Sequence, residues 1–187
     1  MLASAHPSVA VFASDKGPGD AERASIMSQT GSYIARKGGR IVTLAESEGL
    51  AVPLVTSARA AGGEVLVIGD DDFVMPAALT GVPLERIGDA DQRLAHLVAQ
   101  TQVFIGLPGS LASASRLFSG WVKSGGGPGG RPVVLFNRNR AFEAMRGMAT
   151  DVLSHAIRRH DRFVQFTDSV EDLWTKVQWL INEAPRV

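Results

Sequence analysis

The chain has 187 residues, of which 45% are hydrophobic and 20% are charged, and this composition excludes a chain that is disordered throughout. Lysine plus arginine and aspartate plus glutamate number 19 each, so the charge balance gives no basis for binding nucleic acid or an acidic membrane surface. The absence of cysteine excludes disulfides, cysteine zinc sites, iron–sulfur clusters and thiol nucleophiles.

The N-terminal sequence lacks the basic region and the long apolar core of a signal peptide. No apolar run approaches the ~18 residues that a membrane span needs. The four histidines are scattered, with no pair at the spacing of a metal site. We therefore expect a soluble cytoplasmic protein, one domain over residues 1–187, with no bound metal and no cofactor.

Short apolar runs alternate with longer helical patterns along the first half of the chain, and turn signals separate them. In chain order, the sequence predicts a strand at 9–14, a helix at about 21–37 capped by Asp20, a strand at 40–45, a helix at about 49–61 and a strand at 64–69. Residues 70–85 carry no clear period, and we expect them to form an excursion over the strand ends.

The second half continues the same alternation. It predicts a helix at about 90–100, a strand at 102–108, a helix from about 110, a strand at 131–137, a helix at about 140–159, a strand at 162–168 and a helix at 170–184. Strands that are apolar on both faces, each followed by a helix, indicate a parallel sheet covered on both sides. The predicted fold class is therefore α/β, a single doubly wound Rossmann-like domain with a mostly parallel sheet.

The sequence IGLPGSLASASRLFSGW at 105–121 joins a strand end, a Pro-Gly turn and a helix start. A helix that begins near Ser110 leaves its first N–H groups without partners inside the helix, and together with the helix dipole they attract an anion. Gly109 allows a close backbone approach, and serine hydroxyls add donors. An ordinary turn with Ser110 as the N-cap explains the same residues, so the spacing leaves both interpretations open.

Three further charged residues that could belong to a functional site precede this loop in the sequence. Arg93 lies at the margin of an apolar helix face, where a surface arginine is the alternative interpretation. Glu46 and Glu48 follow a strand end, and they either place two carboxylates at the mouth of a site or favour the N-terminus of the next helix.

Taken together, the segments from VAVFASDKG (9–17) to DSVEDLW (168–174) resemble the LOG family, the nucleoside-monophosphate phosphoribohydrolases that activate cytokinins. The sequence LPGSLASASR at 107–116 aligns with the family motif Pro-Gly-Gly-x-Gly-Thr-x-x-Glu. Arg93, fifteen residues before Pro108, matches the family's catalytic arginine. The resemblance implies a homodimer that takes a nucleoside monophosphate or a related phosphorylated small molecule.

The departures from the family pattern fall on the residues that carry its chemistry. Arg116 occupies the position of the motif glutamate, and Ser110 and Ala112 replace two motif glycines. Cleavage of an N-glycosidic bond builds positive charge on the ribose, which a carboxylate stabilises and a guanidinium opposes. By alignment, the candidate phosphate- or nucleotide-binding residues are Ser14, Gly109, Ser110, Leu111, Ala112, Ser113 and Arg116.

Three hypotheses follow. The first is a LOG-like protein with weak or lost phosphoribohydrolase activity, in which Arg93 and the helix start at 110–113 hold the anion of a nucleotide or phosphate. The second is an active hydrolase with catalytic residues Arg93 and Glu46 or Glu48, in which a glutamate replaces the lost acid. A pair of Glu46 or Glu48 with Arg93 or Arg116 would either relocate the carboxylate in this way or close the site structurally. The third is a non-catalytic carrier of a phosphorylated cofactor such as a pterin, which rests on fold analogy.

Overall fold

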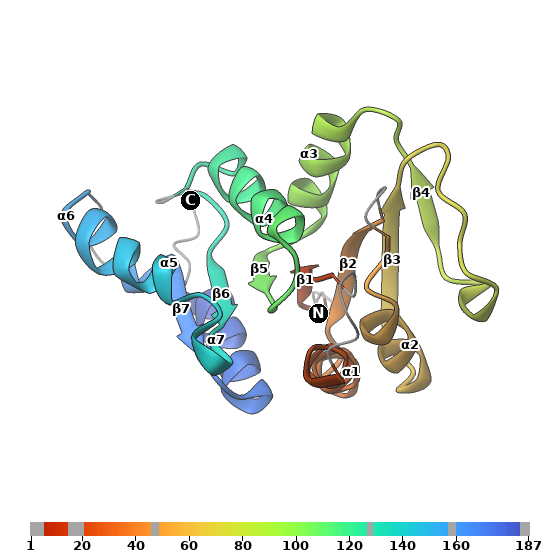
Figure 1. The fold of residues 1–187 in the computed structure, drawn as a ribbon, viewed down its shortest axis with the longest axis horizontal. Helices are drawn as coiled ribbons and strands as arrows, with labels where there is room; N and C mark the ends of the chain where they lie inside the picture. The colour runs from red at the N-terminus through yellow and green to blue at the C-terminus, as the bar shows by residue number, and fades with distance from the viewer. Residues whose placement is uncertain (1–5, 15–20, 46–48, 127–128, 157–159, 184–187) are drawn as a thin grey trace, which may run out of the picture.

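The computed structural model describes residues 6–14, 21–45, 49–126, 129–156 and 160–183. Within these residues, seven parallel strands form one sheet in the order β4-β3-β2-β1-β5-β6-β7 (Figure 1). The strands are β1 Ser8–Phe12, β2 Arg40–Ala45, β3 Glu64–Gly69, β4 Leu84–Arg86, β5 Val103–Gly106, β6 Val133–Phe136 and β7 Val164–Thr167. This confirms the predicted doubly wound α/β class.

Helices cover both faces of the sheet (Figure 1). The longer helices are α1 Ala21–Arg36, α2 Val52–Ala60, α3 Ala90–Gln100, α4 Leu111–Lys123 and α7 Val170–Glu183. The shorter ones are α5 Glu143–Met148, a π-helix at Ala149–Leu153, α6 Ser154–Ala156 and 3-10 turns at Ala77–Leu79, Arg138–Arg140 and His160–Arg162. Among the described residues, no helix combines the length and apolar character that a membrane crossing requires.

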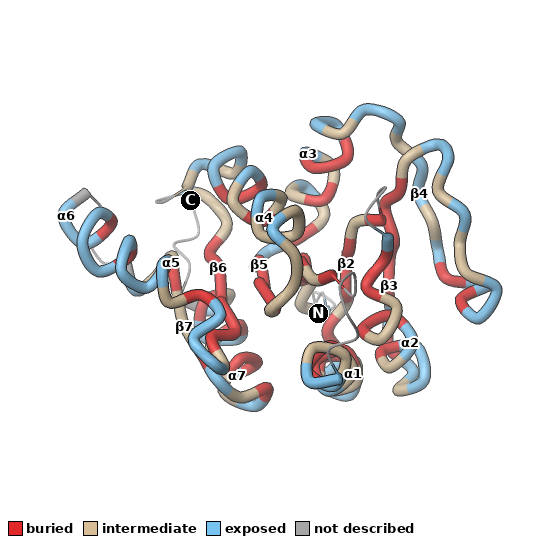
Figure 2. The backbone as a smooth tube through the Cα atoms, viewed as in Figure 1, coloured by how far each residue is buried: buried red, intermediate tan, exposed pale blue. Residues whose placement is uncertain are grey.

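The sheet is buried between two apolar layers, because successive side chains of a strand point to opposite faces. In β1, Val9 and Val11 pack with α1, α2 and α7, whereas Ala10 and Phe12 pack with α3, α4 and α5. Figure 2 shows the strands as a buried band and the outer sides of the helices as exposed. This burial on both faces is why the strands read as continuous apolar runs.

The structure differs from the sequence prediction at 70–85. A seventh strand, β4, begins at the end of this segment and pairs in parallel with β3 at the edge of the sheet. With three residues, of which Glu85 and Arg86 are exposed, β4 is too short to show a period. The rest of the segment forms turns and a 3-10 helix, as an irregular excursion would.

The long helix predicted at about 140–159 is broken. Positive φ angles at Asn139 (55°) and Arg140 (61°) delay α5 until Glu143, and a π-helix follows at Ala149. A residue with positive φ cannot continue a right-handed helix, and neither side chain type signals such a turn by periodicity. The apolar spacing correctly predicts helical structure in this segment, but the irregular backbone divides the helix into shorter pieces.

Candidate functional site

The sheet reverses its strand order between β1 and β5, because β2, β3 and β4 extend from one side of β1 and β5 lies on the other. Ligands of open α/β sheets bind outside the carboxyl ends of the strands at such a point. A small open cavity with a volume of about 40 Å³ lies at this edge. It is lined by Val11, Phe12, Ala13, Ser14, Thr43, Leu44, Gly49, Ser110, Ala112, Ser113 and Arg116.

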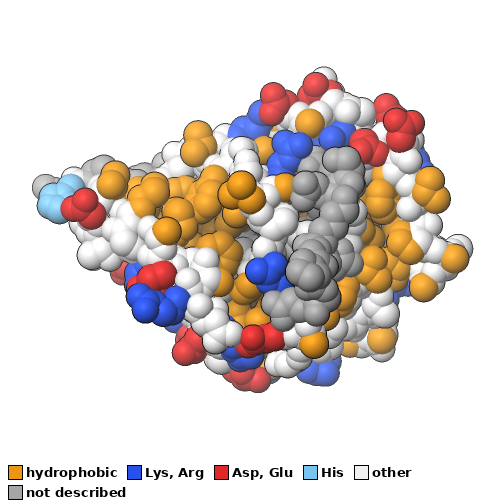
Figure 3. Space-filling view, in the orientation of Figure 1, with side chains coloured by type: hydrophobic (Ala, Val, Ile, Leu, Met, Phe, Trp, Pro, Cys, Tyr) orange, Lys and Arg blue, Asp and Glu red, His pale blue; other side chains and the backbone are white. Residues whose placement is uncertain are grey.

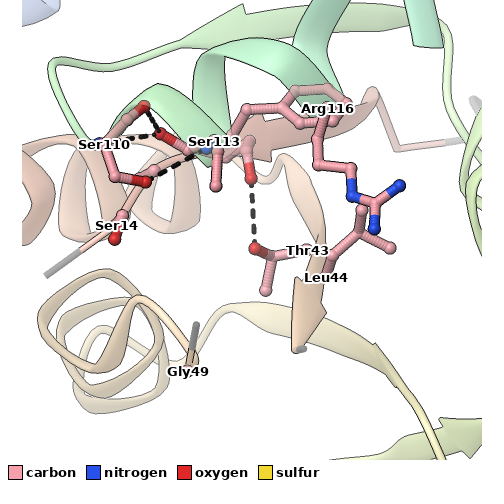
Figure 4. Close-up of a pocket in the computed structure, with 11 residues that line it drawn as sticks. Ser14, Thr43, Leu44, Gly49, Ser110, Ser113 and Arg116 are labelled. Carbon is pink, nitrogen blue, oxygen red and sulfur yellow. Dashed lines mark hydrogen bonds between the residues drawn. The ribbon is translucent and has the colours of Figure 1, made fainter. Parts of the chain in front are cut away.

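The first turn of α4 forms one wall of this cavity (Figure 4). Ser110 is the N-cap, and its hydroxyl accepts a hydrogen bond from the Ser113 N–H at 3.1 Å. In return the Ser113 hydroxyl oxygen accepts from the Ser110 N–H at 3.0 Å. This reciprocal capping box satisfies two of the N–H groups that we expected to be unpaired. The helix start is therefore partly closed by its own side chains.

The N–H groups of Leu111 and Ala112 lie between these two serines. No described residue accepts a hydrogen bond from either of them. Ala112 lines the cavity, whereas the side chain of Leu111 is 88% exposed and points away from the core. Two of the N–H groups predicted to be unpaired at the start of α4 are thus available to a ligand. Leu111 contributes only its backbone N–H group.

The close contacts of Gly109 in the structure are with other parts of the protein, and its predicted contact with a phosphate stays a prediction. A Cβ atom at this position would stand 2.6 Å from the Ser113 Oγ and 3.0 Å from the Ser14 backbone nitrogen. The Arg23 guanidinium donates to the Gly109 carbonyl at 3.0 Å. The turn after β5 is therefore packed tightly against the end of β1 and against α1.

Ser14 and Arg116 bring polar groups to the cavity from two elements. Ser14 follows β1 and is 6% exposed, and Arg116 extends from the second turn of α4 past Leu44 (Figure 4). Arg116 is the only charged residue among the described lining residues, which include no carboxylate. The described wall of the cavity is thus electrostatically suited to an anion.

Arg93 is placed apart from the described lining of this cavity. It is 5% exposed, and its Nη1 donates to the carbonyl oxygens of Ile87 and Gly88 at 2.6 Å each. The guanidinium holds the loop between β4 and α3, so the alternative of a surface arginine is wrong. Its catalytic role stays a prediction.

Glu46 and Glu48, the remaining candidate catalytic residues, lie outside the described residues. The hypothesis that either pairs with Arg93 or Arg116 therefore stays a hypothesis. The chain on both sides of them, at Leu44 and Gly49, does line the cavity.

The floor of the cavity is provided by β1 and β2, and its residues other than Ser14 were not predicted from the sequence. The most informative of these residues is Thr43, which is 1% exposed and donates from its Oγ1 to the Val11 carbonyl at 3.1 Å. A hydroxyl in the middle of an apolar strand is the signal that could have found it, because a buried polar group needs a partner.

Comparisons with known proteins concern the fold of the chain. No protein-family model matches the sequence, and neither does any curated protein with which it was compared. Among solved structures, the chain is similar to the protein TM1055 at 18% identity and a TM-score of 0.69, over 92% of this chain and 99% of that one.

Two further similar structures carry functional descriptions. The molybdenum cofactor carrier protein from Chlamydomonas reinhardtii is 19% identical, with a TM-score of 0.67 over 95% of this chain and 99% of that chain. The molybdenum cofactor binding protein from Rippkaea orientalis is 18% identical, with a TM-score of 0.67 over 96% and 99%. At such identities the likeness establishes a shared fold over almost the whole chain.

Proposed function

We propose that this chain is a divergent LOG-like protein that binds and carries a phosphorylated small molecule, with its phosphate at the start of α4. The main observation behind this proposal is the cavity at the switch point between β1 and β5. Its described wall combines the N–H groups of Leu111 and Ala112 with the guanidinium of Arg116. Backbone N–H groups at a helix start and a nearby cation are the groups that phosphate prefers.

Two observations favour binding over catalysis. The position of the family glutamate holds Arg116, which lines the cavity. A guanidinium stays protonated and cannot act as a general base. In addition, two of the similar structures are described as molybdenum cofactor binding or carrier proteins, which supports a carrier on this fold.

The first prediction concerns AMP as a probe of the cavity. At about 100 times its dissociation constant, AMP adds about 2.7 kcal/mol of stability, which raises the melting temperature of a chain of this size by about 5–10 °C. Arg116→Ala weakens AMP binding by about tenfold or more, since it removes a charge-assisted hydrogen bond. Thermal unfolding at increasing AMP concentration measures both effects.

Arg36→Ala is the matched control for this titration. Arg36 is an exposed arginine in the last turn of α1, whereas the cavity faces the first turn of α4. We expect this variant to bind AMP as the wild type does. The proposal is refuted if neither AMP nor inorganic phosphate stabilises the wild type. Release of adenine from AMP that Glu46→Gln or Glu48→Gln abolishes supports the hydrolase instead.

We also propose that the chain forms a homodimer through the outer side of α4. Hydrophobic side chains gather over α4 and α5 on the face shown in Figure 3. Leu111 and Val122 at the two ends of α4 are 88% and 70% exposed, and Val152 in the π-helix is 54% exposed. Exposed apolar patches of this kind mark contact surfaces, and a second copy of the chain agrees with the resemblance to a dimeric family.

The second prediction tests this surface by placing a charge on it. Val122→Glu raises the dissociation constant of the dimer at least about tenfold, because a buried carboxylate without a partner is strongly unfavourable at an interface. Val74→Glu is the control, since Val74 is 81% exposed on the loop before β4. Sedimentation at several protein concentrations distinguishes the variants. A wild-type chain that stays monomeric contradicts the proposal.

A further inference from the structure

The loop between β6 and α5 contains two adjacent residues with left-handed backbone conformations. Asn139 has φ 55° and Arg140 has φ 61°. Asparagine tolerates this region, because its short side chain bonds locally. Arginine gains no such compensation, so the conformation at Arg140 costs free energy. A glycine would form the same turn at a lower cost, and the turn alone therefore does not explain an arginine here.

The surrounding structure fixes both ends of this loop. Asn137 is 9% exposed, and its Oδ1 accepts from the Phe142 N–H at 2.6 Å while its Nδ2 donates to Glu143 at 3.0 Å. Its backbone N–H donates to the Thr167 carbonyl on β7 at 2.6 Å. A buried amide thus closes the loop across its whole length. Such bracing holds a strained conformation in place.

The side chains inside the loop are fixed as well, with one exception. Arg138 donates from Nε to the Asp168 carbonyl at 3.1 Å and lies over the Phe136 ring. Asn139 donates to the Glu22 carboxylate on α1 at 2.9 Å. Arg140 is exposed, and no described residue forms a hydrogen bond or an ion pair with its guanidinium. A rigid loop therefore presents one unused cation.

The first turn of α1 connects this loop to the proposed binding site. Glu22 holds Asn139, and the next residue, Arg23, donates to the Gly109 carbonyl at 3.0 Å. Gly109 precedes the N-cap of α4, so two consecutive residues of α1 tie the loop of Arg140 to the turn that begins the cavity wall. Both loops follow the carboxyl ends of neighbouring strands, β5 and β6. Ligands of α/β sheets extend along this edge.

We propose that Arg140 is a specificity residue that binds a second anionic group of the ligand, beyond the phosphate held at α4. The inference rests on the proposed function, and it narrows the ligand class to molecules with two anionic groups, such as nucleoside diphosphates. The braced backbone holds Arg140 at one place on this edge, and a guanidinium pairs with phosphate through two parallel hydrogen bonds. The strain at Arg140 is then retained because the side chain serves the ligand.

The test compares AMP and ADP as probes for the wild type, Arg140→Ala, Arg140→Gly and the control Arg36→Ala. The wild type and Arg36→Ala bind ADP about tenfold or more tightly than AMP, and both Arg140 variants lose this preference while they bind AMP normally. Arg140→Gly without ligand also melts about 2–4 °C higher, because glycine relieves the positive φ. Calorimetric titration and thermal unfolding measure the two effects.

The two proposals fail in different ways. If AMP and ADP bind equally well to the wild type, or if Arg140→Ala keeps the preference for ADP, the role of Arg140 is overturned and the phosphate site stands. If neither nucleotide binds, both proposals fall together. A preference for ADP that disappears in the Arg140 variants, with a higher melting temperature for Arg140→Gly, supports the second anion site.

Discussion

Arg93→Ala is expected to lower the free energy of unfolding by about 3 kcal/mol, because hydrogen bonds from a charged donor contribute about 1.5–3 kcal/mol each. The Arg93 guanidinium donates to the carbonyls of Ile87 and Gly88 at 2.6 Å, in a side chain that is 5% exposed. Its removal leaves two carbonyls of the β4–α3 loop without this donor. Urea denaturation of the wild type and the variant measures the loss.

Arg59→Ala is the control, since Arg59 is exposed in the last turn of α2. We expect it to change the free energy of unfolding by no more than about 0.5 kcal/mol, as surface substitutions do. The resemblance to the LOG family implies a different result for Arg93→Ala, namely an intact fold with impaired ligand chemistry. A variant that unfolds like the wild type but no longer binds AMP contradicts the structural role described above.

The strands and helices show how much of the fold local sequence patterns can predict. The apolar runs predicted six of the seven described strands, since burial on both faces leaves a continuous signal. The helical patterns predicted α1, α2, α3, α4 and α7. β4 was missed because a three-residue edge strand depends on β3 for its pairing. Fold class follows from periodicity, whereas edge strands follow from tertiary contacts.

Those features of the site that depend only on a few consecutive residues could be predicted from the sequence. Ser110 as an N-cap was expected, and the structure confirms it. The closing bond from the Ser110 N–H to the Ser113 hydroxyl was not foreseen, because serine replaces the glutamate or glutamine usual at that position of a capping box. Thr43 on the cavity floor comes from another strand, and only the register of β1 with β2 brings it there.

The conformation at Arg140 could not be predicted at all. Nothing in the side chain of arginine favours a positive φ, and the bonds that enforce it come from Asn137 and from Glu22 on α1. Departures of this kind, where a local preference is overruled by distant contacts, are expected at functional sites. Glycines at close contacts between elements are also set by tertiary structure. At such a position the contact with the neighbouring element requires glycine, and the local backbone conformation does not.

Gly31 in the middle of α1 is the strongest case. A Cβ atom there would stand 2.3 Å from the Leu54 carbonyl oxygen and 2.4 Å from the Ser57 Oγ, both on α2. A backbone carbonyl cannot move aside without displacing its helix, so the two helices must separate. Gly147 in α5 is a matched helical glycine with opposite surroundings, since nothing lies within 4 Å of the Cβ it would carry.

Gly31→Ala is therefore expected to destabilise the protein by about 3 kcal/mol, at the upper end of overpacking costs. Gly147→Ala is expected to stabilise it by about 0.5–1 kcal/mol, because alanine loses less backbone entropy than glycine in a helix. Chemical denaturation of both variants beside the wild type gives the two signs. Equal stability of Gly31→Ala and the wild type would contradict this close approach of α1 to α2.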